Sequence, residues 1–317
     1  MTSKYFFKLF SIVVFVFFLS SCIKPNANNR SKKKILQKSK GFNISYDLGI
    51  ADNRYKLPNE LIEVSGLTFL NDSTIACVQD ELGELYTMNI KQSKITSRTN
   101  FGKDGDYEGI AYTQSKVYVL RSNGKIYEIQ KFRQDEQVTN EYKTPLRKYN
   151  NPQGIVYDEK HNRLLIACNG TIGEKATTKN TYSIYAFNLN LKQLNPNPVI
   201  QFSLDDLYGF LNIDGLEKTS KQFAEFFHHG SCNLLTFETS GMAIHPISGN
   251  YYLVSSKANL FMVLSPKGKF QYLRELDKKT FHKPEGITFH SNGDLFISNE
   301  GKMDIANITR FNYVAGM

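Results

Sequence analysis

The chain contains no tryptophan and only four cysteines among its 317 residues. No two cysteines have the C-x-x-C spacing of zinc or redox sites, and no disulfide framework is indicated. The G-x-S-x-G elbow, the phosphate-binding P-loop and the H-E-x-x-H zinc motif are also missing. The sequence therefore carries none of the common local signatures of catalysis. In contrast, tyrosine and phenylalanine are abundant, which favours β-structure.

Acidic residues are missing from the first 41 positions, which hold nine Lys and Arg. The whole chain has 39 Lys and Arg against 30 Asp and Glu, so the remainder is balanced at 30 of each. Because the excess is confined to one end, we expect no nucleic-acid partner. Residues 22–41 are rich in Pro, Asn, Ser and Lys, and we expect a disordered basic linker there. Its cations either lie against anionic lipid headgroups or belong to a solvated spacer.

A short apolar run precedes this linker. Lys4 and Lys8 are followed by an apolar stretch over residues 9–21, which is short for a membrane of roughly 30 Å, so a plain transmembrane anchor is the weaker alternative. A positive start, an apolar core and small residues at its end are typical of an export signal. The final Leu19-Ser20-Ser21-Cys22 resembles a bacterial lipobox. That resemblance implies a signal peptide over 1–21, cleavage before Cys22 and a lipid with acyl chains such as palmitate on its thiol. The mature protein would be a lipoprotein anchored to a membrane of the bacterial cell envelope.

One pattern recurs five times in residues 42–317. Each copy has a polar turn, a glycine within an alternating apolar run, and two further apolar runs. The glycines are Gly66, Gly109, Gly154, Gly241 and Gly286, with steps of 43, 45, 87 and 45 residues. A period in the forties with three or four strands per unit is typical of β-propeller blades. We predict an all-β propeller domain over residues 42–317.

The step of 87 residues leaves the number of blades open between five and six. We favour five, because residues 170–181 read as an insertion, residues 199–202 as a fourth strand and residues 217–229 as a short helix. The fifth copy lacks a fourth strand. We predict that Phe42–Leu48 supplies it and closes the ring, which removes open sheet edges.

Several longer phrases are more specific than a generic propeller. They cover residues 63–69, 78–86, 101–111, 214–218, 240–246 and 283–288. Together with the lipobox, they resemble the SdiA-regulated family of β-propeller proteins. The resemblance implies a propeller at the bacterial cell envelope and no particular chemistry. More distant propeller relatives include lactonases and phytase-like phosphatases that bind calcium, but fold alone does not give function.

The residue before each repeat glycine is polar. The first strand of a blade lines the central channel, so these residues are predicted to form a ring at one mouth: Ser65, Glu108, Gln153, Ser240 and Glu285. Turns after the second strands add oxygens from Asp80, Glu81, Asn169, Asn299 and Glu300. Oxygen ligands suit a hard cation such as Ca²⁺, with Glu108, Glu285, Asp80 and Glu300 as candidate ligands. The alternative is an architectural role, in which each polar side chain bonds the next blade.

Two functions remain open from the sequence. The first is a binding module at the membrane, which holds a cation or small polar ligand at the channel mouth or docks another envelope protein. The second is a metal-dependent hydrolase, similar to a phosphoesterase or lactonase, with its site at the same mouth. A hydrolase needs a metal and a base within reach of a bound water.

Overall fold

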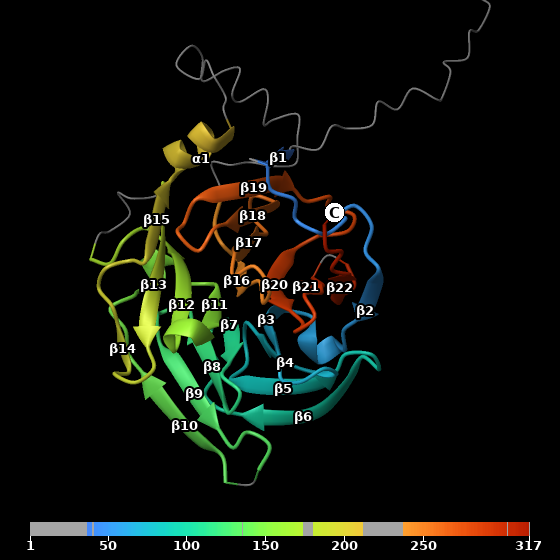
Figure 1. Ribbon diagram of the computed structural model, residues 1–317. Helices are drawn as coiled ribbons and strands as arrows, with labels where there is room; N and C mark the ends of the chain where they lie inside the picture. Colours follow the sequence, from blue (N-terminus) through green and yellow to red (C-terminus); the bar gives the residue numbers. More distant parts are fainter. Residues whose placement is uncertain are drawn as a thin grey trace, which may run out of the picture. The chain divides into compact units, whose positions relative to one another are not determined.

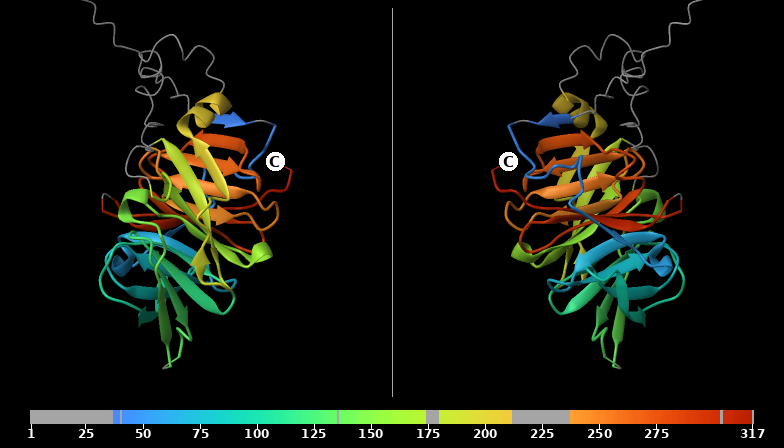
Figure 2. Two further views of the ribbon diagram at one scale, coloured as in Figure 1. Left: turned by 90° about the vertical axis from the view of Figure 1, so that its left-hand side faces the viewer. Right: turned by 90° about the vertical axis from the view of Figure 1, so that its right-hand side faces the viewer.

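The computed structural model describes residues 37–39, 41–134, 136–173, 180–211, 237–302 and 304–316. They form five antiparallel sheets, arranged as propeller blades around a common centre (Figure 1). Side views show the strands of the orange sheet, residues 241–275, lying one above another (Figure 2). The predicted signal peptide, Cys22 and the predicted helix at 217–229 lie outside the described residues.

The blades follow one another along the chain. Blade 1 consists of β3 (Val64–Phe69), β4 (Thr74–Gln79), β5 (Glu84–Asn89) and β6 (Lys94–Asn100). Blade 2 consists of β7 (Tyr107–Tyr112), β8 (Lys116–Arg121), β9 (Ile126–Gln130) and β10 (Val138–Tyr142). Blade 3 consists of β11 (Ile155–Asp158), β12 (Arg163–Asn169), β13 (Thr181–Asn188), β14 (Gln193–Leu194) and β15 (Ile200–Ser203). Blade 4 consists of β16 (Gly241–Ile244), β17 (Tyr251–Ser255), β18 (Leu260–Leu264), β19 (Phe270–Glu275) and β1 (Gln37–Ser39). Blade 5 consists of β20 (Pro284–Phe289), β21 (Leu295–Asn299), β22 (Asn307–Phe311) and β2 (Asn53–Lys56).

Helices are few in the described residues. They are α1 (Leu204–Leu211) and the 3-10 turns η1 (Asn59–Leu61), η2 (Lys148–Asn150) and η3 (Glu159–His161). The predicted fourth strand of blade 3 is confirmed within a residue, because β15 pairs with β13. The short β14 pairs with the other end of the same strand.

The five inner strands form a closed ring. They contact one another in the order β3, β7, β11, β16, β20 and back to β3 (Figure 1). Because β11 contacts β16 directly, no blade lies between blades 3 and 4, and the prediction of five blades is confirmed.

The repeat glycines set how closely the inner strands approach. A Cβ atom at Gly66 would lie 2.8 Å from the Cα of Gly109, and one at Gly241 would lie 2.5 Å from the carbonyl oxygen of Glu285. Real Cβ atoms do not approach backbone this closely, so a side chain at either position would push two blades apart. The glycine of each repeat is therefore a packing requirement.

Five hydrophobic clusters fill the five interfaces between neighbouring blades. Strand β4 shows how one sheet contributes side chains to two of these clusters. Ile75 and Cys77 belong to the cluster shared with blade 5, whereas Ala76 and Val78 belong to the cluster shared with blade 2. Successive side chains of a strand point to opposite faces, so a blade that is buried on both faces needs apolar residues at nearly every position. Burial raises the pKa of the Cys77 thiol to about 12, consistent with a packing role.

An N-terminal strand closes the ring, but the residues differ from the prediction. β2 pairs with β22 and completes blade 5, so the assignment of this role to Phe42–Leu48 is wrong. Ile44, Tyr46 and Leu48 instead pack into the core between blades 4 and 5 without pairing to a sheet. Ser45 has a φ of 59°, which interrupts an extended strand. The end of the predicted linker also differs, because Gln37–Ser39 forms β1 and pairs with β19.

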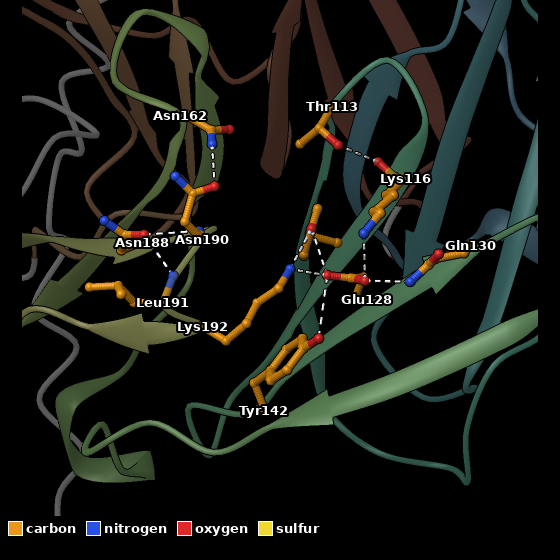
Figure 3. A network of polar contacts seen from close by, with 11 residues as sticks. Thr113, Lys116, Glu128, Gln130, Tyr142, Asn162, Asn188, Asn190, Leu191 and Lys192 are labelled. Carbon is orange, nitrogen blue, oxygen red and sulfur yellow. Dashed lines mark hydrogen bonds and ion pairs between the residues drawn. The ribbon is translucent and has the colours of Figure 1, made fainter.

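A buried cluster of ion pairs connects blade 2 to blade 3 (Figure 3). Glu128 on β9 is 1% exposed and forms ion pairs with Lys116 of its own blade and with Lys192, which lies in the turn between β13 and β14. Tyr118 donates a 2.7 Å hydrogen bond to the same carboxylate. Burial opposes ionisation of Glu128, but these donors outweigh it and lower its pKa to about 2. The carboxylate is fully partnered, which makes it a structural contact between blades.

We expect Gly66→Ala to destabilise the whole domain by about 1–3 kcal/mol, the usual range for overpacking a closed core. The reason is the overlap with the Gly109 backbone. Urea unfolding followed by far-UV circular dichroism measures it. The matched control is Gly209→Ala in α1, where no atom lies within 4 Å of the added Cβ. That variant is expected to be neutral or stabilised by up to about 1 kcal/mol.

Equal changes in the free energy of unfolding for the two substitutions would contradict the packing role of Gly66.

Candidate functional site

The five predicted ring residues lie at one end of the ring, which we call the amino end because all five inner strands begin there. Three of them lie at β-bulges. The ladder between β3 and β4 skips Ser65, that between β7 and β8 skips Glu108, and that between β20 and β21 skips Glu285. Bulges redirect side chains out of a sheet and are common beside functional sites.

Three members of the ring have partners that hold the fold together. Ser65 donates a 2.6 Å hydrogen bond to the carbonyl oxygen of Tyr107 in the next blade. The hydroxyl of Ser240 accepts the backbone N–H of Ser256 at 2.9 Å, and Gln153 donates to Asn151 at 3.2 Å. The architectural role considered from the sequence thus applies to Ser65 directly.

The two glutamates of the ring behave differently. Burial raises the pKa of Glu108 to about 8, with further contributions from the nearby charges of Asp106, Glu285 and Asp80. Burial also raises the pKa of Glu285, and the Lys283 ammonium, 3.2 Å from its carboxylate, partly offsets this effect. The raised pKa of Glu108 favours its protonated form near neutral pH.

Asp80 and Glu63 form a coupled pair of carboxyl groups. Burial and the neighbouring Glu63 raise the pKa of Asp80 to about 7. The pKa of Glu63 is lowered, chiefly by Lys302, whose ammonium lies 2.6 Å from the Glu63 carboxylate. Glu63 is therefore the ionised partner, and Asp80 is poised to gain or lose a proton near pH 7.

Glu300 joins these pairs into one cluster. It is 3% exposed, it forms an ion pair with Lys283, and it lies 4.0 Å from the ammonium of Lys302. Its charge acts on both Asp80 and Glu285. The four carboxylates proposed from sequence as cation ligands are therefore neighbours: Asp80, Glu108, Glu285 and Glu300.

Sequence reasoning missed a second polar ring, which lies two residues before the first in every blade. Its members are Glu63, Asp106, Asn151, Glu238 and Lys283. Asn151 donates to Glu238 across the boundary between blades 3 and 4 at 3.3 Å. All five members lie in the turns that precede the inner strands, so the two-residue period of a strand held no signal for them.

Several buried acceptor oxygens at this end have no hydrogen-bond donor. They are Asp80 Oδ1, Asn169 Oδ1, Asn299 Oδ1 and Glu300 Oε1. Each follows or ends the second strand of a blade, and these strands run antiparallel to the inner ones, so all four residues lie at the amino end. Leaving a buried polar group unsatisfied costs about 1–3 kcal/mol. Among the described residues, the amino end thus has buried acceptor oxygens that no hydrogen-bond donor pairs with.

The geometry does not by itself make a metal centre. Within the residues that the structure describes, no group of three or more His, Cys, Asp or Glu side chains is spaced to hold a metal ion. A cation here would need amide oxygens as well as carboxylates. Ca²⁺ accepts that mixture of ligands, and Asn169 and Asn299 supply the amides.

A cavity lies at the opposite end of the ring. It has a volume of about 700 Å³ and is lined by the later residues of the inner strands, among them Thr68, Tyr112, Tyr157 and Thr288. None of the four carboxylates proposed as ligands lines it. The acidic cluster and the cavity are therefore two separate features.

The sequence matches the model of the SdiA-regulated family over residues 49–303, so the chain belongs to that family. No curated protein matches it.

Several solved structures are similar in fold. A glutaminyl cyclase from Myxococcus xanthus has a TM-score of 0.54 and 11% identity, covering 84% of this chain and 97% of that one. A protein of unknown function from Bacteroides thetaiotaomicron has a TM-score of 0.49 and 12% identity, covering 84% and 60%. A virginiamycin B lyase from Staphylococcus aureus has a TM-score of 0.41 and 14% identity, covering 82% and 73%. At 11% identity, the similarity to the glutaminyl cyclase shows a shared propeller fold and nothing about activity.

The pKa of Glu108 predicts a pH-dependent stability. Between its ordinary value of 4.5 and its raised value of about 8, folded Glu108 keeps a proton that the unfolded chain has released. The stability that this proton supports is present below pH 4.5 and is lost as pH rises to 8. Glu108→Gln should thus be more stable than the wild type at pH 8.5, by on the order of 2 kcal/mol, with little difference at pH 4.5. Urea unfolding at both pH values measures this.

The matched control is Glu141→Gln on the outer strand of blade 2. Lys125 lowers the pKa of Glu141, so this variant should lose stability at neutral pH. If Glu108→Gln follows the wild type at a constant offset across the pH range, its carboxyl group is not the buried, raised group described.

Proposed function

We propose that this SdiA-regulated propeller is a binding module whose amino end takes a cation or a small cationic ligand. The observation that carries this proposal is the set of buried oxygens without donors beside Asp80 and Glu300. A bound cation or ammonium group would satisfy these oxygens. It would also relieve the repulsion that, after burial, contributes to the raised pKa values of Glu108 and Asp80.

Ca²⁺ fits the donor set best among common ions, because Asn169 and Asn299 add neutral oxygens to the carboxylates. Lys283 and Lys302 already neutralise part of the cluster. A bound divalent ion would have to displace or share their contacts, so the proposal includes a rearrangement of these two lysines. A small ammonium ligand needs a smaller change.

A metal-dependent hydrolase of the phosphoesterase or lactonase type is the second candidate. It is favoured by one observation: Glu108 and Asp80 have pKa values of about 8 and 7, which suit proton transfer at neutral pH. When bound, the metal would polarise the substrate or activate water. Glu108 would then hold the proton for the leaving group. An esterase and phosphatase panel with Ca²⁺ separates this candidate from simple binding.

Ca²⁺ should raise the melting temperature of the domain in a concentration-dependent way. A ligand that binds only the native state adds about 2.7 kcal/mol at a hundredfold excess over Kd. The double variant Glu108→Gln with Glu285→Gln should lose the response, whereas Glu136→Gln with Glu141→Gln, outside the cluster, should keep it. The readout is scanning calorimetry with Ca²⁺, Mg²⁺ and an alkylammonium salt as titrants. A flat melting temperature with all three would end the binding proposal for this end of the ring.

We also propose that the protein acts at the bacterial cell envelope, held to a membrane by lipid on Cys22. The support is the lipobox after a short apolar run, and the balanced charge of the folded part leaves membrane attachment to the N-terminal segment. Among the described residues, no helix is long and apolar enough to cross a membrane. Docking to another envelope protein remains compatible with this placement.

Cys22→Ser should abolish labelling with a radioactive fatty acid and leave the precursor uncleaved, because the thiol is the acceptor of the lipid. Labelling and gel mobility in bacteria that express the full chain measure both effects. Cys77→Ser serves as the control, since that thiol is buried in the propeller core. Normal labelling of Cys22→Ser would refute lipidation at this position.

A further inference from the structure

The cavity at the end of the ring opposite to the amino end has the size and lining of a ligand site. We call it the carboxyl-end cavity, because the inner strands end there. Its volume of about 700 Å³ lies in the range of small-molecule sites. Most of its wall comes from blades 3 and 4, and it is separate from the acidic amino end.

Its wall is part apolar and part polar, in nearly equal shares, and the apolar part is aliphatic and aromatic. Inner-strand side chains contribute the aliphatic part, and three tyrosines contribute rings: Tyr112, Tyr157 and Tyr251. The apolar part of the wall favours an apolar ligand body, since burial of apolar surface away from water is favourable.

One guanidinium in the wall is held in a fixed position. Arg163 at the start of β12 donates through Nε to Asp158 at 2.8 Å, and Asp158 is 6% exposed. The charge of Arg163 also acts on the hydroxyl of Tyr251 across the boundary between blades 3 and 4. The Arg163 side chain retains 23% exposure. A guanidinium has five N–H donors, so the hydrogen bonds to Asp158 and to the Tyr251 hydroxyl leave further N–H groups for a ligand.

One oxygen of Asp158 already has two partners. The same oxygen that accepts from Arg163 also lies 2.8 Å from Nδ1 of His161. A cationic ligand would have to compete with both groups, whereas an anionic ligand needs only the outer edge of Arg163. The other titratable groups in the wall are Glu159, which accepts from Gln114, Lys160, which is exposed, and His245, which burial keeps neutral.

We propose that the carboxyl-end cavity binds a small apolar molecule with one anionic group, a carboxylate, sulfonate or phosphate, which pairs with Arg163. The apolar body would lie against the tyrosines, and the anion would take the terminal nitrogens of the guanidinium. Fork-shaped donors of arginine match such anions in geometry. This site is independent of the cation proposed at the amino end.

Two matched dyes test the proposal. 1-Anilinonaphthalene-8-sulfonate carries a sulfonate, and N-phenyl-1-naphthylamine has the same rings without it. The purified domain should bind the sulfonate dye at least about tenfold more tightly, since a charge-assisted hydrogen bond discriminates by roughly that factor. Fluorescence titration measures both dissociation constants. Equal affinities for the two dyes, or no binding of either, would overturn the proposal.

Variants locate the site. Arg163→Gln should remove the preference and leave the affinity for the neutral dye unchanged, while Asp158→Asn should keep the preference because the guanidinium remains. Thr68→Tyr should fill the cavity and weaken both dyes. Arg98→Gln, which makes the same charge change at an ion pair on blade 1, is the control. Preserved preference in Arg163→Gln, or wild-type binding by Thr68→Tyr, would contradict the assignment.

Loss of folding is checked separately. Far-UV circular dichroism should be the same for all variants, and Arg163→Lys preserves the charge opposite Asp158. That variant should bind the sulfonate dye with an affinity between those of the wild type and Arg163→Gln. If Arg163→Lys is folded and shows no preference for the sulfonate dye over the neutral one, a charge at this position does not select anions.

Discussion

The structure depends on the close approach of five inner strands at the repeat glycines. A single Cβ atom at Gly66 would overlap the backbone of the neighbouring blade. This constraint fixes the distance of each sheet from the centre, and it thereby fixes the width of the five hydrophobic interfaces. It also explains why the glycine recurs although the rest of each repeat varies, since the smallest residue is needed only where backbones meet.

Close packing at the centre has an electrostatic consequence. The residues before the glycines are brought together at the amino end, where Glu108 and Glu285 lie half-buried beside other acids. Burial of carboxyl groups of like charge is unfavourable, and proteins retain such arrangements mainly at functional sites. The oxygens without donors at Asp80, Asn169, Asn299 and Glu300 add to this cost. The opposite end has no comparable cluster of like-charged groups among the described residues, and it is hollow instead.

The interfaces between blades combine apolar clusters with a few fully satisfied polar contacts. Glu128 crosses from blade 2 to Lys192 of blade 3 (Figure 3). Tyr46 does the same between blades 4 and 5, because its hydroxyl donates to the carbonyl oxygen of Gly293 and lies 2.8 Å from Nε2 of His245. Both contacts have their donors and acceptors paired, which distinguishes them from the amino end. That contrast is the reason why Glu128 is described as a structural contact and why binding is only proposed for the acidic cluster.

The sequence by itself determined the features that repeat locally. The glycine period predicted the blades, the family phrases predicted the family, and the position before each glycine located the ring that includes Glu108 and Glu285. Glu63 and Asp106 escaped this reading because they lie in the turns before the inner strands, where no period applies. Each of these features is encoded within one blade of about 45 residues.

Only the tertiary structure decided the features that depend on residues far apart in the sequence. The alternation of apolar residues in Phe42–Leu48 does not distinguish a paired strand from a segment packed into a core. The prediction therefore chose this segment, whereas Asn53–Lys56 forms the closing strand. The raised pKa values depend on charges from several blades, and the cavity beside Arg163 depends on how two blades diverge. Such properties arise from distances between chain segments that the local pattern does not specify.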